Sequence, residues 1–342
     1  MSAELPIPAH FNPVEAGILR RIPYQQLAAD SETWAKKYDL QPAQDDEFRV
    51  ALLGVDIQNT FCLPGFELFV AGRSGKGAVE DNCRLAEFIY RNLHRITGII
   101  PTMDTHQALQ IFHSVFLVNP AGRHPEPLTV IHRADIEKGA WHVHPQAARA
   151  LGMAPEQADR YLQHYVKTLD EGGKFALNIW PYHAMLGGVG HALAPVFEEA
   201  VFFHTLARFS PPDFVIKGRH ALTESYSASR PEVQTDAQGR PLDTHSENLF
   251  EKLLQYDAVL VAGQAKSHCV AWTVENLFSD LLEKRPDFVK QIYLLEDCTS
   301  PVVVPGVIDF TEQADEAFQR FSEAGMHLVR SADPMDSWLE MR

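Results

Sequence analysis

The chain has 342 residues, of which 45% are hydrophobic and 22% are charged, and its formal net charge is −15 at pH 7. These fractions are typical of a soluble globular protein that is long enough to bury a full α/β core. Because the charge is negative and Lys and Arg do not gather in a stripe, we expect neither nucleic acid nor an anionic membrane as a partner. No run is apolar enough over a sufficient length to predict a transmembrane helix.

The amino terminus and the cysteines indicate a cytoplasmic protein. Residues 1–10 lack the basic and apolar regions of a secretory signal. The four cysteines, at positions 62, 83, 269 and 298, show no paired spacing. We therefore expect a reducing compartment with free thiols. The sequence leaves open whether the chain forms a homo-oligomer.

Residues 1–48 are predicted to form an amino-terminal extension. Prolines at positions 6, 8, 13 and 23 interrupt it, residues 31–38 have the pattern of a short helix, and residues 45–47 form an acidic hinge. The main domain is expected over residues 49–330, and residues 331–342 form a tail.

Apolar runs alternate with helical patterns through the main domain. The strand-like runs are residues 50–55, 96–100, 214–216, 258–262, 291–295 and 327–329. Helical patterns cover residues 78–93, 246–255, 270–281 and 313–323. This alternation predicts a mostly parallel sheet of about six strands in a three-layer α/β/α sandwich.

Asp56 ends the first strand-like run. The carboxyl edge of a buried strand is where ligands of open α/β sheets gather, so this carboxylate is a candidate for acid/base chemistry. Its ordinary alternative is a cap or turn residue.

A carboxylate and two imidazoles indicate a metal site. Asp104 and His106 follow the second strand-like run and are two residues apart, so in an extended segment both side chains face one way. His183, in the segment Trp-Pro-Tyr-His, supplies a third ligand. Such a set suits zinc, iron or manganese with positions left open. Asp-x-His pairs also arise by chance in loops, which is the alternative for this pair alone.

The long segment 114–179 is predicted to be an insertion that covers the pocket mouth or contributes to subunit contacts. His113, just before it, is a further residue that we place near the metal. The insertion has a helical pattern at residues 155–169. Its histidines are interpreted as surface residues, with a second metal site as the alternative; they are His124, His132, His142, His144 and His164.

Lys217 and Cys269 complete a set of reactive groups. Lys217 ends a short apolar run, and Cys269 lies after the break at Gly263, directly before the predicted helix 270–281. Unpaired N–H groups and the helix dipole at such a position stabilise a thiolate. A solvated charge and a small core residue are the respective alternatives. An acid/base, a cation and a thiol together indicate nucleophilic catalysis.

These segments resemble the isochorismatase-like cysteine hydrolases and, within them, the nicotinamidases, over residues 49–330 outside the insertion. Residues 55–62 are similar to the first motif of the family, with Thr60 where an acidic residue is more usual. Residues 263–270 are similar to its nucleophile motif, although positions 264, 266, 267 and 268 depart from the commonest residues. Residues 180–188 resemble a Trp-Pro-x-His element with a glycine-bearing loop, and Cys298 lies in a further element in which we expect a structural role.

The resemblance implies an amidase mechanism. Asp56 would take the proton of Cys269, the thiolate would attack a carboxamide, and Lys217 would stabilise the ionised forms. The backbone N–H groups of Ala265 and Cys269 would form the oxyanion hole, next to a cis peptide at residues 264–265.

The resemblance also implies a metal cofactor and a substrate ring. A divalent ion, zinc in the first place and iron or manganese as alternatives, would be held by Asp104, His106 and His183 and would orient a pyridine nitrogen. Phe61 and Trp180 would flank the ring, and core packing is the alternative for both.

Three functions follow from these observations. The first is a metal-containing nicotinamidase that converts nicotinamide to nicotinate and ammonia. The second is a cysteine hydrolase of the same superfamily that acts on another small amide, which the insertion and the unusual residues around Cys269 keep open. The third is a binding protein without enzymatic activity on a degenerate scaffold.

Overall fold

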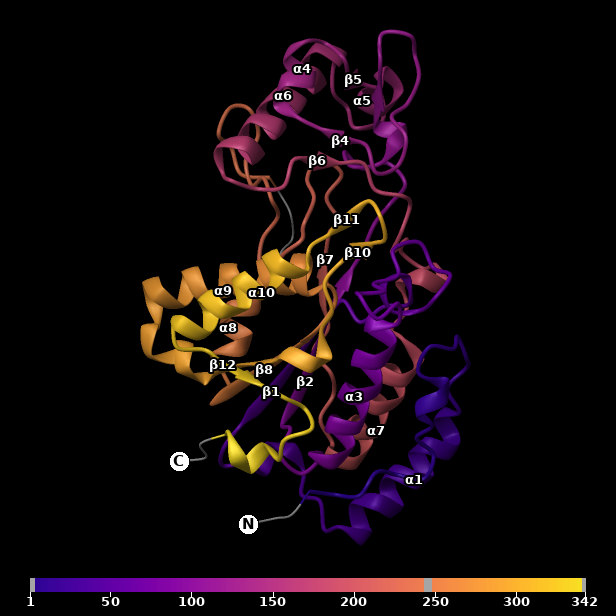
Figure 1. Ribbon diagram of the computed structural model, residues 1–342, viewed down its shortest axis with the longest axis vertical. Helices are drawn as coiled ribbons and strands as arrows, with labels where there is room; N and C mark the ends of the chain where they lie inside the picture. The colour runs from indigo at the N-terminus through magenta and orange to yellow at the C-terminus, as the bar shows by residue number, and fades with distance from the viewer. Residues whose placement is uncertain (1–3, 243–247, 340–342) are drawn as a thin grey trace.

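The centre of the computed structural model, which describes residues 4–242 and 248–339, is a six-stranded parallel sheet (Figure 1). Its strand order is β12-β9-β8-β1-β2-β7, and every neighbouring pair is parallel. The strands are β1 (Val50–Val55), β2 (Gly98–Asp104), β7 (Val215–Lys217), β8 (Ala258–Gly263), β9 (Ile292–Leu295) and β12 (His327–Val329). This sheet and its flanking helices confirm the predicted fold class.

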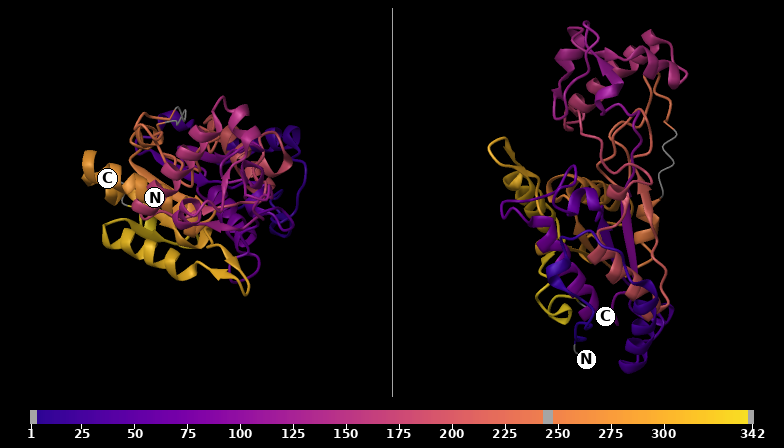
Figure 2. Two further views of the ribbon diagram at one scale, coloured as in Figure 1. Left: turned by 90° about the horizontal axis from the view of Figure 1, so that it is seen from above. Right: turned by 90° about the vertical axis from the view of Figure 1, so that its right-hand side faces the viewer.

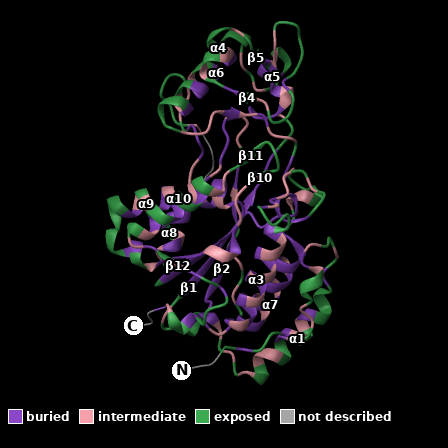
Figure 3. Ribbon diagram, in the orientation of Figure 1, coloured by how far each residue is buried: buried purple, intermediate pink, exposed green. Residues whose placement is uncertain are grey.

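Helices cover both faces of the sheet and complete the three layers (Figures 1 and 3). Leu52 packs in one core cluster, whereas its neighbours Ala51 and Leu53 pack in another, as the alternation of a strand requires. Both faces of β1 are therefore buried, which is typical of a parallel strand. One face carries α3 (Gly77–Arg91) and α7 (Pro195–Arg208), and the other carries α8 (Leu249–Leu253), α9 (Ala271–Lys284) and α10 (Thr311–Glu323).

The strand predicted over residues 96–100 lies later in the chain, at β2. Thr97 lies just before this strand and donates its N–H to the carbonyl oxygen of Val50 at 2.8 Å. Pairing with β7 from Thr102 onward extends the strand to Asp104, so Asp104 ends the strand itself. The predicted helix 246–255 is shorter, at α8, and its first two residues lie outside the described residues.

The long helix α7 has no counterpart among the predicted elements. Ten of its residues are buried, because the sheet and α3 cover its inner face and α1 (Tyr24–Lys37) covers its outer face. A helix that is apolar nearly all round shows no 3.6-residue pattern, which is why sequence periodicity does not reveal it.

Residues 4–48, predicted to be an extension, pack against the main domain. Helix α1 starts well before the predicted helix 31–38, since Leu27 already donates its N–H to Pro23. Leu5 and Leu27 belong to the same core cluster as the sheet. The amino-terminal segment is therefore part of the main core.

Residues 114–179 form a lobe beyond the sheet (Figures 1 and 2). The lobe has its own hydrophobic cluster around Phe116, Tyr165 and Leu169. Val233, from the segment between β7 and α8, belongs to this cluster, so a second segment of the chain packs into the lobe. The elements of the lobe are β3 (Leu117–Val118), β4 (Val130–Ile131), α4 (Arg133–Glu137), β5 (His142–Val143), α5 (Pro145–Ala150), α6 (Pro155–Glu171) and β6 (Leu177–Asn178).

Two smaller elements lie next to the candidate functional site that is described below. Helix α2 (Asn59–Cys62) follows β1, and the strands β10 (Val303–Val304) and β11 (Ile308–Asp309) form a hairpin after β9. Within residues 4–242 and 248–339, every helix is too short or too polar to cross a membrane.

A buried histidine on α7 predicts acid sensitivity of the fold. The His204 ring nitrogen Nε2 donates to the carbonyl oxygen of Ile96 at 2.8 Å. Burial lowers the pKa of His204 to about 4, and this hydrogen bond opposes the shift only in part. The unfolded chain gains a proton near pH 6.5 that the folded chain does not bind. We therefore expect a loss of about 3 kcal/mol of stability as the pH falls from 6.5 to 4.

Urea unfolding at pH 7 and pH 4.5 measures this loss. His204→Gln keeps an N–H donor and removes the titrating group, so the free energy of unfolding should depend less on pH in that variant. An equal dependence in both proteins would contradict the assignment to His204.

Candidate active site and metal site

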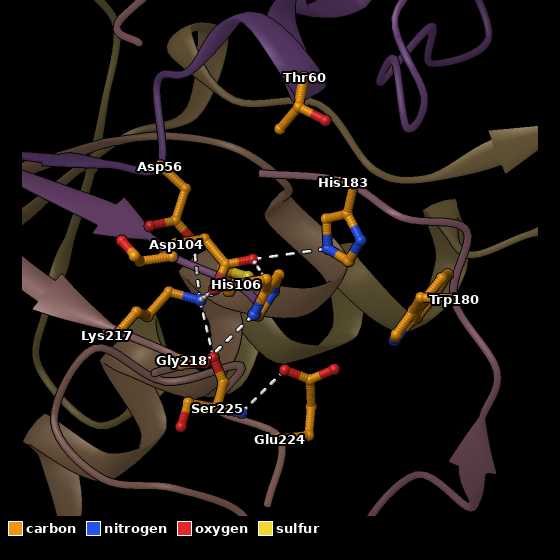
Figure 4. Close-up of polar contacts among 12 residues, drawn as sticks. Asp56, Thr60, Asp104, His106, Trp180, His183, Lys217, Gly218, Glu224 and Ser225 are labelled. Carbon is orange, nitrogen blue, oxygen red and sulfur yellow. Dashed lines mark hydrogen bonds and ion pairs between the residues drawn. The ribbon is translucent and has the colours of Figure 1, made fainter. Parts of the chain in front are cut away.

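Polar groups from four neighbouring strands meet at the carboxyl edge of the sheet. Asp56 follows β1, Asp104 and Lys217 end β2 and β7, and Cys269 lies in the turn after β8. The strands β8, β1, β2 and β7 are consecutive in the sheet. The structure therefore brings together Asp56, Lys217 and Cys269, which are far apart in the sequence. Figure 4 shows Asp56 and Asp104 close to the side chain of Lys217.

The ammonium group of Lys217 is the centre of this cluster. Its Nζ lies 3.0 Å from Asp56 Oδ2, 3.2 Å from Asp104 Oδ1 and 3.5 Å from Cys269 Sγ. It also donates to the carbonyl oxygen of Ser225 at 2.7 Å. All of these residues are buried, so each charge depends on its partners to offset the loss of water.

The carboxylate of Asp56 is held from its other side. Thr102 Oγ1 donates to Asp56 Oδ1 at 2.5 Å and accepts the backbone N–H of Asp56 at 3.1 Å. Asp56 has a φ of 49°, in the left-handed region that non-glycine residues adopt rarely. These contacts leave Oδ2 facing Lys217.

Burial and the lysine oppose each other in setting the protonation states. Burial raises the pKa of the Cys269 thiol and of the Asp56 carboxyl, and the positive charge of Lys217 works against both shifts. Burial would lower the pKa of Lys217, but Asp104, Asp56 and Cys269 hold it well above its ordinary value. These shifts favour a charged ammonium group on Lys217 and a protonated thiol on Cys269 at neutral pH.

The turn after β8 places the cysteine. Gly263 has a φ of 119°, and a Cβ there would come within 2.1 Å of the carbonyl oxygen of Val55, so only glycine fits. A cis peptide follows between Gln264 and Ala265, as predicted, and then a π-helical turn (Lys266–Val270) that contains Cys269. Among the described residues, the N–H of Ala265 has no hydrogen-bond acceptor.

A buried carboxyl group on α3 anchors this turn. Gln264 Nε2 donates to Asp81 Oδ2 at 2.9 Å, and Gln264 Oε1 accepts the N–H of Ser300 at 3.3 Å. Arg84 pairs with Asp81 at 2.7 Å. Burial raises the pKa of Asp81 to about 6, against these hydrogen bonds. Gln264, a departure from the commonest motif, thus links the turn to α3.

Asp104, His106 and His183 lie together as candidate metal ligands. Their ligand atoms lie within 4.8 Å of one another, and all three residues are buried. Asp104 Oδ2 is 2.8 Å from His106 Nε2 and 3.6 Å from His183 Nε2. One carboxylate and two imidazoles suit a divalent ion such as zinc, with further positions open.

The hydrogen bonds of both imidazoles favour metal binding. His106 Nδ1 lies 3.2 Å from the carbonyl oxygen of Gly218, and His183 Nδ1 lies 2.8 Å from that of Pro181. A carbonyl oxygen only accepts, so each Nδ1 carries a hydrogen, and each Nε2, which faces Asp104 Oδ2, is the nitrogen that would bind an ion. Gly218 is required here, because its φ is 79° and a Cβ would come within 2.7 Å of Asp104 Oδ1. The donor set therefore fits a metal.

His113 lies beside this group but outside it. Its ring centre is 6.0 Å from that of His106 and 6.3 Å from that of His183. Burial lowers the pKa of His113 to about 3, so its ring is neutral. In the lobe, the rings of His124 and His144 stack at 5.5 Å, but among the described residues no second group of metal ligands forms.

A cavity of about 320 Å³ opens beside Cys269. Phe61 and Trp180, the predicted substrate-lining residues, both line it. Their ring centres lie 5.7 Å and 6.4 Å from that of His183, so both aromatic side chains border the candidate metal site. The cavity is of the size that small-molecule sites have.

Several site residues lie outside every predicted motif. Glu224 is buried, lines the cavity and accepts the N–H of Ser225 at 2.8 Å. Burial raises the pKa of Glu224 to about 7, with His106 opposing the shift. Tyr226 lines the cavity as well, and so does His268, which belongs to the predicted nucleophile motif but is not among the residues predicted to face the substrate. The segment around Glu224 has no apolar run and no recognisable spacing, so the sequence offers no signal there.

Two other supporting residues do have a sequence signal. Gln58 clamps the backbone of Asp104, since it accepts the N–H at 2.8 Å and donates to the carbonyl oxygen at 2.8 Å. It lies two residues after Asp56, and Thr102 lies two residues before Asp104. The two-residue period of extended backbone could have indicated Thr102, whereas Gln58 follows the left-handed Asp56 and is indicated only by its place in the motif at residues 55–62.

Comparisons with known proteins find similarity only among solved structures; no protein-family model and no curated protein matches the chain. A nicotinamidase/pyrazinamidase of Acinetobacter baumanii is 21% identical, with 84% of this chain and 99% of that chain covered and a TM-score of 0.47. The yeast nicotinamidase Pnc1p is 17% identical, with 82% and 99% covered and a TM-score of 0.48. A pyrazinamidase of Pyrococcus horikoshii in complex with zinc is 17% identical, with 82% and 99% covered and a TM-score of 0.42.

Proposed function

We propose that this chain is a nicotinamidase-type amidohydrolase that converts a small carboxamide to its acid and ammonia through a thioester on Cys269. One set of contacts supports the proposal. The Lys217 ammonium touches both the Asp56 carboxylate and the Cys269 sulfur, beside a cavity of about 320 Å³. The type and order of these groups also agree with the resemblance to the isochorismatase-like cysteine hydrolases.

The first half of the reaction forms the thioester. Because its pKa is raised, the Cys269 thiol needs a base, and Asp56 accepts its proton. The sulfur attacks the carboxamide carbon, and the oxygen that becomes negative meets the N–H groups of Ala265 and Cys269. Asp56 then returns the proton to the nitrogen, the C–N bond breaks and ammonia leaves. Throughout, Lys217 stabilises whichever partner is ionised.

The second half consumes one water molecule. Asp56 takes a proton from the water as its oxygen attacks the thioester carbon. The C–S bond then breaks, the sulfur regains a proton from Asp56, and the carboxylic acid is released. The enzyme returns to its initial protonation state.

Asp104, His106 and His183 would hold a divalent ion, with zinc as the first choice and iron or manganese as alternatives. Such an ion supplies a coordination position for the ring nitrogen of a pyridine or pyrazine carboxamide. The side chains of Phe61 and Trp180, which border these ligands, would then pack against the ring.

Ammonia release from nicotinamide, pyrazinamide and a panel of unrelated amides tests the proposal, with metal content measured in the same preparation. We expect turnover of at least one pyridine or pyrazine carboxamide. A metal-loaded protein that is inert towards the whole panel would leave only the binding-protein alternative.

Loss of one imidazole should empty the metal site. In His183→Ala we expect metal affinity to fall at least about a hundredfold, since even outer partners of a ligand contribute 10- to 100-fold. Nicotinamide turnover should fall with it. The matched control is His142→Ala in the lobe, whose ring is exposed and pairs with Asp159. Metal analysis after dialysis should find one ion per chain in the control; equal metal content in both variants would refute the ligand assignment.

A second candidate function is hydrolysis of a different small amide by the same groups. Thr60, which stands where the family more often has an acidic residue, donates its hydroxyl at 2.9 Å to Oε2 of Glu67, and Glu67 lines the cavity. Residues 302–304 of the hairpin segment and Leu128 of the lobe also reach the wall. These local features favour a changed substrate with unchanged chemistry.

A further inference from the structure

We propose that the outer part of the cavity is a subsite for an apolar group carried by the substrate, so that the preferred substrate is a ring carboxamide with an apolar, aromatic extension. The inference rests on the proposed amidohydrolase function, whose reacting groups occupy only the inner part of the cavity.

The first observation is size. A dry apolar cavity of about 150 Å³ holds one benzene ring. The cavity beside Cys269 has about 320 Å³, which is roughly twice that space. A single pyridine carboxamide therefore leaves a large part of it unfilled, and unfilled space gives up dispersion contacts that a larger ligand would make.

The second observation is how polarity is distributed over the wall. The ionisable groups of the proposed reaction and metal site are linked by direct contacts, from Cys269 to Lys217, from Lys217 to Asp104 and from Asp104 to His183. Glu224 joins them through Ser225, which it contacts at 2.8 Å and whose carbonyl oxygen accepts from Lys217. These groups are therefore confined to one region of the cavity.

The remaining wall is largely apolar. It includes Phe66, Leu68, Phe69, Leu128, Val303 and Val304. Glu67 is the charged residue on this part of the wall, and its Oε2 accepts the hydroxyl of Thr60 at 2.9 Å. A polar extension would find little to bind here, whereas an apolar one removes apolar surface from water on both sides.

The third observation is that the apolar wall reaches the surface. Leu128 is 52% exposed and Val304 is 37% exposed, although both line the cavity. Leu128 comes from the lobe and Val304 from β10, so both the lobe and the hairpin contribute exposed side chains to the cavity wall. A substituent that extends outward from the ring would cover these side chains.

Pyridine-3-carboxamides with a phenyl group at ring carbon 4, 5 or 6 test the subsite against nicotinamide itself. We expect at least one of them to have a kcat/KM roughly ten- to a hundredfold above that of nicotinamide, the range that added apolar contacts give in a pocket. Ratios at or below one for all three amides would overturn the subsite.

Two variants of the hairpin make the test specific. Val304→Asp should lower the ratio of kcat/KM for the extended amide over nicotinamide at least about tenfold, because it places a charge against the apolar group. Val307→Asp, on the same hairpin but 77% exposed and outside the cavity wall, is the matched control and should leave the ratio as it is. Equal ratios in the two variants would place the apolar group elsewhere and overturn the proposal.

Calorimetric titration of the metal-loaded protein with the same amides separates this inference from the proposed function. Tighter binding of an extended amide by a protein that hydrolyses none of them would refute the amidohydrolase and retain the subsite. Hydrolysis of nicotinamide together with weaker binding of every extended amide would retain the amidohydrolase and refute the subsite.

Discussion

Replacement of Cys269 by alanine is expected to reduce kcat for the preferred amide by about 10⁴-fold or more, since loss of a nucleophile leaves only binding and oxyanion contacts. Cys269 is only 8% exposed and alanine is smaller, so the chain should still fold. Acid-quenched mass spectrometry should find an acylated Cys269 peptide in the wild-type protein and none in the variant.

Cys83→Ala is the matched control for this substitution. Cys83 is a second free thiol, half-buried on α3 and outside the cavity wall. Its variant should keep the activity of the wild-type protein. A similar loss in both variants, or full activity in Cys269→Ala, would exclude the thioester mechanism.

Lys217→Met is expected to affect stability and catalysis together. The change keeps the length of the side chain but removes the charge between Asp56 and Asp104, which lie 3.0 Å and 3.2 Å from Nζ. Breaking a buried ion pair by removing one partner costs about 3–5 kcal/mol. We expect the free energy of unfolding to fall by about that amount and kcat by about 10²- to 10⁴-fold.

Lys36→Met provides the comparison. Lys36 pairs with Glu32 on the exposed side of α1, and a pair of that kind is worth about 0.3–0.5 kcal/mol. Urea unfolding of both variants therefore separates a buried charge from a surface one. If the two variants lost equal stability, Lys217 would not be the charge that holds the two carboxylates together.

Much of the sheet and most of the reactive groups can be predicted from the sequence. Asp56 and Lys217 stand out because each is a polar residue at the end of an apolar run, and Cys269 because it lies between such a run and a predicted helix. The ends of parallel strands share one edge of a sheet, so the three residues are expected to meet there. The spacing of Asp104 and His106 is likewise readable, because alternate residues of extended backbone face one way. Each of these patterns depends only on residues that are close in the sequence, so folding does not alter what it indicates.

Other features depend on what lies next to a residue after folding. Helix α7 is buried between the sheet and α1, so it is apolar on both sides and its sequence lacks the alternation of polar and apolar faces that predicts a helix. Glu224 becomes part of the site only because the segment after β7 returns to the cavity. The hydrophobic cluster of the lobe combines residues 114–179 with Val233. These two segments are far apart in the sequence, and no local pattern indicates that they pack together.

The two carboxylate oxygens of Asp104 face in different directions, so this one side chain contacts two different groups of the site. Oδ1 touches Lys217 at 3.2 Å, whereas Oδ2 touches His106 at 2.8 Å. Any replacement of this side chain is therefore expected to disturb both the surroundings of the proposed nucleophile and the proposed metal ligands, so its kinetic defect combines the two effects. Under the proposed function, substitutions at His183, whose ring nitrogens face Asp104 and Pro181, should change substrate orientation without removing a contact of Lys217.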